Sequence, residues 1–144
     1  MPQFTISEVA RRVGLQPSAI RYYEKIGVLL PGLRISGRRR YDATVFYRLA
    51  VIQRARQSGF TLEEIRQLFF GFRDGTRASK RWQKMSRKKL KELDTLVAGI
   101  ESMRNLLKKM MQVCHCTTLD QCGRGIFHRE YGELPGKSLS QSNH

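Results

Sequence analysis

Apolar side chains recur at helical spacing through the second half of the chain. Between residues 93 and 110 they follow one another at steps of three or four, which sustains a heptad seam made by Leu93, Leu96, Ile100, Met103, Leu107 and Met110. This pattern predicts one long helix from Ser79 to Met111 that pairs with a second helix along the seam. Packing of the same stripe into the core of its own domain is the alternative interpretation.

The seam changes character near the beginning of this helix. The strict heptad register places Ser86 and Lys89 on the seam, whereas Trp82 and Met85 lie just beside it. Polar residues are poor contacts between paired helices. We therefore expect the first turns to pack against another part of the same chain, the helix that begins after Thr61.

Two shorter helices are predicted near the N-terminus. Thr5-Ile6-Ser7-Glu8 is a capping box that opens the first helix, and Gly14 ends it. Gln16-Pro17-Ser18 begins the second helix, which runs to Lys25 and has proline in its first turn. Two short helices joined by a glycine-containing turn form a helix-turn-helix.

The second of these helices carries the candidates for reading DNA bases. In a helix-turn-helix, the second helix enters a major groove and presents the side chains near its N-terminus to base edges. We expect Ser18 and Arg21 to have this position, and Ile20 and one of the two tyrosines that follow Arg21 to face inward. Helical hairpins also occur in proteins that bind no nucleic acid, so the next segment matters to the interpretation.

A β-hairpin is predicted after the second helix. Turn residues at Gly27, Pro31-Gly32 and Gly37 separate the apolar positions Val28, Leu29, Leu30, Leu33 and Ile35, a pattern typical of two short strands joined by a turn. Tyr41 closes the hairpin, which is decorated by Arg34, Arg38, Arg39 and Arg40. Arginines on a protruding hairpin reach phosphates or the minor groove of DNA. We therefore interpret the hairpin as a wing.

Two further helices complete the predicted N-terminal domain. Asp42 is expected to cap a helix from residue 43 to 57, and Thr61-Leu62-Glu63-Glu64 is a second capping box. The turn Asp74-Gly75-Thr76 precedes the long helix. The predicted division of the chain is a DNA-binding domain, a dimerisation helix, an effector loop that contains the cysteines, and a flexible tail, at residues 1–76, 77–112, 113–127 and 128–144.

The charge of the chain agrees with a polyanionic partner. Its 144 residues carry 27 Lys and Arg against 12 Asp and Glu, a formal net charge of +15, and residues 1–60 alone carry 11 against 3. Such an excess on an N-terminal domain suggests nucleic acid. No apolar run approaches the roughly 18–20 residues that span a bilayer, and the first residues lack the features of a signal peptide. We expect a cytoplasmic protein without a membrane partner.

Three cysteines within nine positions are the main chemical signal. Cys114, Cys116 and Cys122 have the spacing Cys-x-Cys-x5-Cys, and an odd number so closely placed does not suggest a disulfide framework. Thiolates are soft ligands that suit Zn(II), Cu(I), Hg(II) or iron–sulfur clusters. These cysteines are therefore candidate metal ligands, and His115 is a further candidate.

Three motifs in this order resemble the mercury-resistance-regulator (MerR) family of bacterial transcription factors. The segment from Ile20 to Leu29 (IRYYEKIGVL) resembles the family signature. Gly37-Arg38-Arg39-Arg40-Tyr41 is similar to its wing, although the family often has tyrosine where Arg38 stands, and residues 59–65 (GFTLEEI) are similar to its fourth helix. The resemblance covers roughly residues 4–125.

This resemblance implies a mainly α fold: a winged helix-turn-helix domain, a long helix that forms an antiparallel coiled-coil homodimer, and a short C-terminal cysteine loop. Members bind a palindromic operator between promoter elements. Effector binding lets the dimer distort the DNA so that RNA polymerase engages both elements. Family positions that contact DNA match Arg21, Tyr23, Arg39 and Tyr41, and the full predicted DNA-binding set is Ser18, Arg21, Tyr22, Tyr23, Arg34, Arg38, Arg39, Arg40 and Tyr41.

The resemblance also bears on the effector. Cys114 and Cys122 resemble the two-cysteine loop of the family's copper sensors, and Ser79 stands where its divalent-metal and mercury sensors carry a cysteine. SoxR-like redox sensors have a fourth cysteine where this chain has Met111, so an iron–sulfur cluster would lack one thiolate. A three-thiolate site for Zn(II), Cu(I) or Hg(II), which includes Cys116, is the leading prediction.

Other functions are weaker interpretations of the same residues. A redox- or thiol-responsive regulator is the first alternative. A drug-binding member of the family would need a ligand-binding domain, and the roughly 30 residues after the long helix are too few for one. A thiol enzyme would need a nucleophile held against a base, and neighbouring side chains such as His115 and Cys116 point apart on an extended loop. We therefore expect a regulator and not an enzyme.

Overall fold

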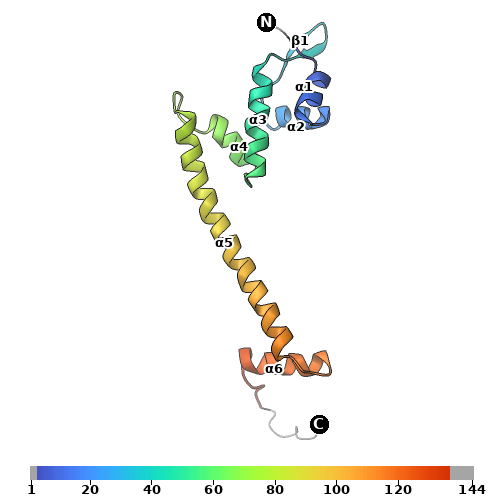
Figure 1. Ribbon diagram of the computed structural model, residues 1–144, viewed down its shortest axis with the longest axis vertical. Helices are drawn as coiled ribbons and strands as arrows, with labels where there is room; N and C mark the ends of the chain where they lie inside the picture. Colours follow the sequence, from blue (N-terminus) through green and yellow to red (C-terminus); the bar gives the residue numbers. More distant parts are fainter. Residues whose placement is uncertain (1–2, 137–144) are drawn as a thin grey trace. The chain divides into compact units, whose positions relative to one another are not determined.

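The computed structural model describes residues 3–136, which form two compact units that divide after Asp94. The first unit contains five complete elements, α1 (Ile6–Val13), α2 (Pro17–Lys25), the hairpin β1 (Leu33–Ile35) with β2 (Arg38–Arg40), α3 (Thr44–Gln57) and α4 (Leu62–Phe70). Helix α5 (Ala78–Val113) begins in the first unit and ends in the second, where α6 (Leu119–Tyr131) follows it (Figure 1). None of the described helices has the length and apolar character needed to cross a membrane.

The predicted helix boundaries follow from local hydrogen bonds. Both capping boxes are present: Thr5 Oγ1 accepts the Glu8 backbone N–H at 3.1 Å, and Thr61 Oγ1 accepts that of Glu64 at 3.1 Å. Gly14 ends α1 with a left-handed backbone (φ 74°), a conformation that costs glycine least. These signals involve neighbours in the sequence, and the structure confirms them.

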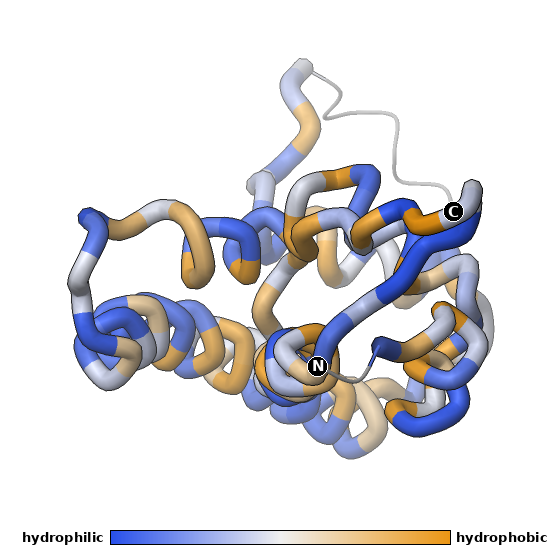
Figure 2. The backbone as a smooth tube through the Cα atoms, turned by 90° about the horizontal axis from the view of Figure 1, so that it is seen from above, coloured by the Kyte–Doolittle hydropathy of each residue, from blue (hydrophilic) through white to orange (hydrophobic). Residues whose placement is uncertain are grey.

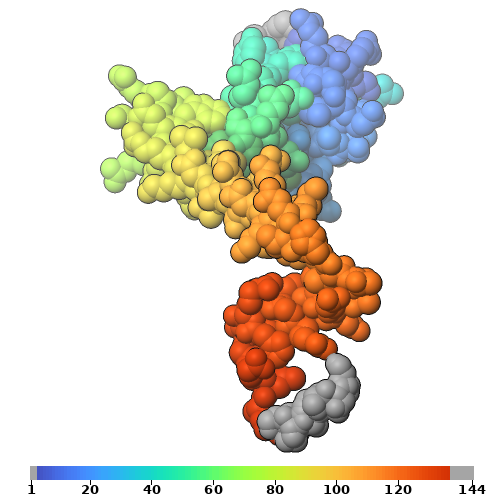
Figure 3. All heavy atoms as spheres, turned by 60° about the horizontal axis from the view of Figure 1, so that its bottom comes forward, coloured from blue at the N-terminus to red at the C-terminus, as the bar shows by residue number. Residues whose placement is uncertain are grey.

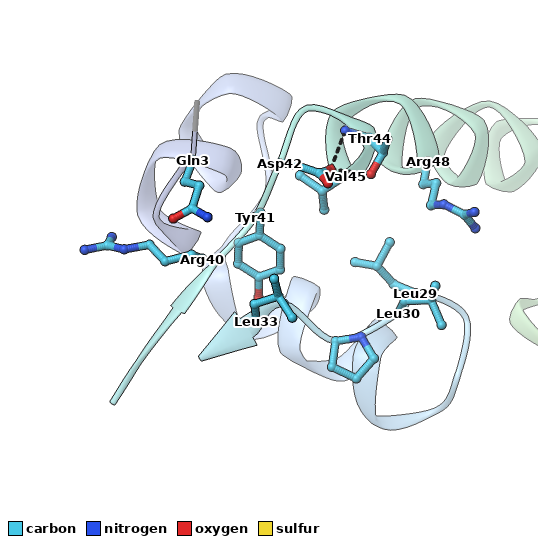
Figure 4. A pocket seen from close by; sticks show the side chains of 12 residues that line it. Gln3, Leu29, Leu30, Leu33, Arg40, Tyr41, Asp42, Thr44, Val45 and Arg48 are labelled. Atoms are coloured by element: carbon cyan, nitrogen blue, oxygen red, sulfur yellow. Dashed lines mark hydrogen bonds between the residues drawn. The ribbon is translucent and has the colours of Figure 1, made fainter. Parts of the chain in front are cut away.

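Helix α3 begins one residue later than predicted. Its N-cap is Ala43, which has no side chain that can cap, so Asp42 is not the N-cap. The Asp42 carboxylate nevertheless accepts the Thr44 backbone N–H at 2.9 Å, and it also accepts the Thr44 hydroxyl (Figure 4). These hydrogen bonds hold the pKa of Asp42 below its ordinary value. The carboxylate thus stabilises the first turn from one position further out.

Helical faces from all four short helices supply the core of the first unit. Most of its fully buried side chains come from α1, α2, α3 and α4, and they include Val9, Ile20, Leu49, Ile52 and Ile65. Hydrophobic and hydrophilic residues alternate along the backbone (Figure 2), and the amphipathic pattern is strong in α1, α2 and α4 but not in α3. Phe4 lies at the edge of this core, where its ring meets Phe46 edge to face. The core fixes how α2 is presented to the outside.

The first turns of α5 pack on this core, as the drift of the heptad seam predicted. Trp82 and Met85 lie against the core cluster, and the Trp82 ring is 6.1 Å from that of Phe60. Figure 3 shows the first part of α5 beside α4. Lys89 is only 8% exposed and donates to Glu64 Oε1 and Glu92 Oε2, each at 2.8 Å. Lys89, although on the heptad seam, therefore connects α5 to α4 through a salt bridge, which we call the tie between the two helices.

The wing is shorter than predicted. Strands β1 and β2 pair antiparallel from Leu33 opposite Arg40 to Ile35 opposite Arg38, and the Ser36-Gly37 turn has positive φ at both residues, as a two-residue hairpin requires. The apolar residues before Pro31 do not belong to a strand. Val28 and Leu29 are instead buried in the core, which anchors the loop that leads to the wing.

A buried glutamate connects the wing to α2. Glu24 Oε1 accepts hydrogen bonds from the Arg39 guanidinium at 2.8 Å and from the Tyr41 hydroxyl at 3.0 Å. Glu24 Oε2 accepts a hydrogen bond from the Gly32 backbone N–H at 2.8 Å. The Glu24 side chain is 4% exposed. Gly32 must be glycine here, because a Cβ would lie 2.7 Å from the Tyr41 ring. One side chain of α2 therefore holds two residues of the wing and its base, Arg39 and Tyr41, and the loop that precedes the wing at Gly32.

Tyr41 lies at the base of the wing. It is 4% exposed, forms a bridge with Phe4, and its ring lines a pocket of about 280 Å³ together with Leu33 and Leu29 (Figure 4). Tyr41 therefore holds the base of the wing, and its direct contact with DNA stays a prediction. Burial, followed by the hydrogen bond to Glu24 and the charge of that carboxylate, raises the pKa of Tyr41 to about 12.

The second unit contains a helix where a loop and a tail were predicted. Thr118 caps α6 by accepting the Gln121 N–H at 3.1 Å, and the Gln121 side chain accepts the Thr117 N–H at 3.0 Å. Gly123 and Gly125 lie inside α6, and glycine costs a helix about 1 kcal/mol relative to alanine. They explain why the segment resembled a loop. Of the predicted tail, residues 137–144 lie outside the described residues.

The raised pKa of Tyr41 predicts a loss of stability at alkaline pH. In the unfolded chain the phenol ionises near pH 10, whereas in the folded protein it does so only at about 12. Between these values the unfolded state binds fewer protons, so the free energy of unfolding falls as the pH rises. The advantage of the wild type over Tyr41→Phe should shrink across this range in urea unfolding measured at a series of pH values. A difference in unfolding free energy between wild type and Tyr41→Phe that stays constant across this pH range would contradict the raised pKa of Tyr41.

The tie between α5 and α4 predicts different effects for two adjacent lysines. Lys89→Ala leaves the partly buried Glu64 without its cation, which should lower the free energy of unfolding by about 1–3 kcal/mol. Lys88 is exposed, and Lys88→Ala should change it by less than about 0.5 kcal/mol. Denaturant unfolding at equal protein concentration compares the two variants. Equal effects would show that Lys89 does not hold α5 to α4.

Candidate functional site

Helix α2 presents polar residues on its outer face. Ser18 and Arg21 are exposed in the first half of the helix, and Tyr22 is 51% exposed beside them. Ile20 is fully buried, and Tyr23 is half-buried and packs against the core. The expectation that Ile20 and one tyrosine face inward is confirmed, and the inward tyrosine is Tyr23. This face is free to approach a ligand, whereas Tyr23 has only part of its ring available.

Arginines line a cleft between α1, α2 and the wing. The cleft measures about 490 Å³ and is bordered on one side by the first turn of α1, from Thr5 to Ser7. The other lining residues include five arginines, Arg21, Arg34, Arg38, Arg39 and Arg40. A concentration of guanidinium groups beside a helix N-terminus attracts anions, above all phosphates. The cleft has the charge and shape expected of a contact with a nucleic-acid backbone.

The wing arginines do not have equal freedom. Arg38 is exposed, and Arg34 is exposed with its guanidinium 3.4 Å from the Gly37 carbonyl. Arg39 is held by Glu24, so only about 30% of its side chain faces solvent. Glu24 was not among the predicted site residues. Its sequence signal is that it is the only acidic residue between Glu8 and Asp42. A lone carboxylate among so many arginines indicates an internal ion pair.

The second unit brings the three cysteines together. The Sγ atoms of Cys114, Cys116 and Cys122 all lie within 4.8 Å of one another, and those of Cys114 and Cys122 are 4.0 Å apart. Cys114 follows the last turn of α5, and Cys122 lies in the first turn of α6, so the two helix ends position the cluster. Three thiolates at about 2.3 Å from one ion in a plane are about 4 Å apart, so the spacing fits a shared soft metal ion.

The thiols of the cluster influence one another. The backbone N–H of Cys116, followed by the thiols of Cys116 and Cys122, lowers the pKa of the Cys114 thiol by hydrogen bonding. Hydrogen bonding to Cys114, followed by burial, raises the pKa of the Cys116 thiol. All three cysteines are free thiols. The candidate ligand His115 is exposed and does not belong to this group of ligand atoms within the described residues.

The predicted seam is an apolar row on α5 that is mostly exposed within residues 3–136. From Leu96 to Leu107 its residues are exposed, and Met110 is half-buried. Gly99 has no neighbour within 4 Å of the place of a Cβ, so this glycine leaves open space on the helix surface. An apolar row of this length is unusual on a free surface and marks an interaction site.

Comparisons with known proteins agree with these features. A family model described as a MerR helix-turn-helix family regulatory protein matches residues 4–70, and one described as MerR, DNA binding, matches residues 46–110. The two matches together cover the helix-turn-helix, the wing and most of α5. They also include Arg21, the wing arginines and the seam.

The chain is similar to known transcriptional regulators over most of its length and theirs. The HTH-type transcriptional regulator HmrR of Rhizobium leguminosarum bv. viciae is 36% identical over 117 residues, which are 81% of this chain and 91% of the relative. Heavy metal-dependent transcription regulator 2 of Rhizobium meliloti is 34% identical over 118 residues, 81% and 80% of the two chains. A solved MerR-family regulator from Bacillus cereus has the same fold, with a TM-score of 0.57, 24% identity and coverage of 89% and 96%. The chain therefore belongs to the MerR family of DNA-binding transcriptional regulators, and it is a regulator rather than an enzyme.

Proposed function

We propose that this protein is a homodimeric transcriptional activator that responds to a thiophilic metal ion. The observation that carries the proposal is the convergence of three thiols within 4.8 Å at the junction of α5 and α6. A relative at 34% identity is named as heavy metal-dependent, which supports the same effector class. As a regulator of bacterial type, the protein acts on chromosomal DNA in the cytoplasm.

The DNA target is a palindromic promoter operator. Ser18, Arg21 and Tyr22 face the major groove from α2, whereas Arg34 and Arg38 contact phosphates from the wing. A dimer presents two copies of this surface, which suits two half-sites related by twofold symmetry. Activation follows from distortion of the DNA between the promoter elements, so that RNA polymerase engages both.

The homodimer forms through the seam of α5 as an antiparallel coiled coil. Exposed apolar residues at heptad spacing need a partner helix to be removed from water, and a second copy supplies the same row. The open surface at Gly99 suits a close approach of two helices. Because the first turns of α5 are tied to α4, the pairing of α5 sets how the two DNA-binding units are held.

The effector site uses Cys114, Cys116 and Cys122 as a three-thiolate set. Three soft ligands favour Zn(II), Cu(I) or Hg(II) over hard cations such as Mg(II). A standard iron–sulfur cluster needs a fourth ligand, which the cluster of thiols lacks within the described residues. Binding of the ion holds the end of α5 and the start of α6 together at one point. The ordered junction then acts on the DNA-binding unit through α5.

Two arginines distinguish base reading from phosphate contact. Arg21→Ala should weaken binding to the operator selectively, by about 1–3 kcal/mol if it reads a base, and leave binding to unrelated DNA nearly unchanged. Arg38→Ala should weaken binding to both and reduce the salt slope by about one unit per lost phosphate contact. Fluorescence anisotropy over a salt series compares the variants. Equal loss on all sequences for Arg21→Ala would exclude it as a base reader.

The cysteines are tested by substitution with serine. Cys114→Ser and Cys122→Ser should abolish the metal response and retain operator binding, because the DNA-binding unit does not contain them. Cys116→Ser should weaken the response and change the metal-to-thiolate absorption if three sulfurs bind the ion. Titration of the reduced protein with each metal, with operator binding as the control, measures both. An unchanged response in Cys114→Ser and Cys122→Ser would contradict metal sensing, and unchanged absorption in Cys116→Ser would leave a two-thiolate site.

A further inference from the structure

A basic stripe on the first half of α5 is not used by the proposed function. From residue 77 to residue 91, eight of the 15 side chains are Lys or Arg and none is Asp or Glu. Six of these residues are exposed, and the five that lie on α5 define what we call the basic stripe: Lys80, Lys84, Arg87, Lys88 and Lys91. At 3.6 residues per turn they fall within an arc of roughly 100° and extend for about 17 Å along the helix.

The basic stripe lies on the side of α5 opposite to the core. Trp82, Met85 and Lys89 occupy the buried side of the same turns. The side chains of Lys80, Arg87 and Lys88 make no ion pair with any described residue, and Lys84 contacts the Phe72 ring at 5.8 Å. Lys91 has an interaction partner of its own. The charges of Lys80, Arg87 and Lys88 therefore face outward and do not serve the packing of α5.

The position of this charge is unfavourable for the helix itself. The N-terminus of a helix carries partial positive charge and favours acidic side chains, such as Glu8 in α1 and Glu63 and Glu64 in α4. Helix α5 has no acidic residue in its first turn. Lysines at successive turns of one face also repel one another. An anionic partner would relieve both effects.

The composition of the basic stripe favours a phosphate backbone over a protein surface. Protein–protein interfaces are built around apolar and aromatic anchors, and lysine is depleted in them. The stripe contains lysine at four of its five positions and no apolar side chain. Contacts with DNA phosphates need only a row of cations at the spacing of a linear polyanion.

The stripe is separate from the surface that carries Arg21 and the wing arginines. Within the first unit, the beginning of α5 lies beyond α4, whereas α1, α2 and the wing lie on the other side of α3 (Figures 1 and 3). None of the residues that line the arginine cleft belongs to α5. The stripe and the cleft are therefore separate surfaces, each available to its own stretch of DNA.

We propose that the basic stripe is a second, sequence-independent binding site for double-stranded DNA. It holds phosphates of a DNA segment outside the one bound by the helix-turn-helix and the wing. The interaction is electrostatic and has no base reading, so it depends strongly on salt. It does not require a metal ion or the cysteine cluster.

The experiment uses the full chain saturated with an unlabelled operator duplex, obtained by selection from a random pool with the wild-type protein. A labelled duplex of unrelated sequence is then added, and its binding is followed by anisotropy over a salt series. The test variant is Lys80→Gln/Lys88→Gln, which removes two exposed charges of the stripe. Its matched control is Lys108→Gln/Lys109→Gln, which removes two exposed charges from the later part of α5.

The wild type and the control should bind the second duplex, and the test variant should bind it at least several-fold more weakly. Its salt slope should fall by about 0.9 for each lost phosphate contact, with operator affinity and thermal unfolding unchanged. Failure of the operator-saturated wild type to bind the second duplex would overturn the proposal, as would equal binding by the test variant. If that variant binds both duplexes normally but loses activation by RNA polymerase, the stripe is a protein contact and the proposal is wrong.

Discussion

The buried carboxylate of Glu24 is the interaction on which the DNA-binding unit depends. A wing of three residues per strand cannot be stable alone, because so small a hairpin buries almost nothing. Glu24 compensates by accepting hydrogen bonds from Arg39, Tyr41 and the Gly32 backbone at 2.8–3.0 Å. The helix that presents Arg21 to the outside thereby also sets the position of the wing. In the function proposed above, one side chain therefore positions both the helix that reads bases and the wing that contacts phosphates.

A second tie connects this unit to the long helix. Lys89 lies between Glu64 and Glu92 and over the Phe60 ring, next to the packing of Trp82. Its place on the heptad seam gives the first turns of α5 a contact within the same chain. The same helix therefore differs along its length: its beginning packs on the DNA-binding unit, and its later apolar row is exposed, which is the basis of the proposed pairing.

Most features that depend on neighbouring residues were predictable from the sequence, whereas most hydrogen-bond partners far apart in the chain were not. The capping boxes at Thr5 and Thr61 and the left-handed Gly14 involve neighbours within a few positions. The convergence of the cysteines was expected only if the chain between them folds back, and the start of α6 provides that fold. Tyr41, in contrast, resembled a surface tyrosine, and only the contacts with Phe4 and Glu24 across the sequence show that it is buried.

Helix α6 shows how local signals can compete. Gly123 and Gly125 indicated a loop, whereas Thr118 and Gln121 have the spacing of a capping box that indicates a helix start. The capping interaction prevails and places Cys122 in the first turn of α6. This geometry is what turns three nearby cysteines into a cluster. Because of its two glycines, the sequence of α6 did not predict the helix that positions Cys122 in the proposed effector site.

The most direct test of metal-dependent activation is transcription in vitro from a promoter that contains the selected operator, with purified RNA polymerase and the reduced protein. Addition of a soft metal ion should raise the amount of transcript, and a chelator that competes for the ion should return it to the starting level. Hard cations such as Mg(II) should not replace the soft ion. A transcript level that is the same with and without every soft metal ion would contradict the account.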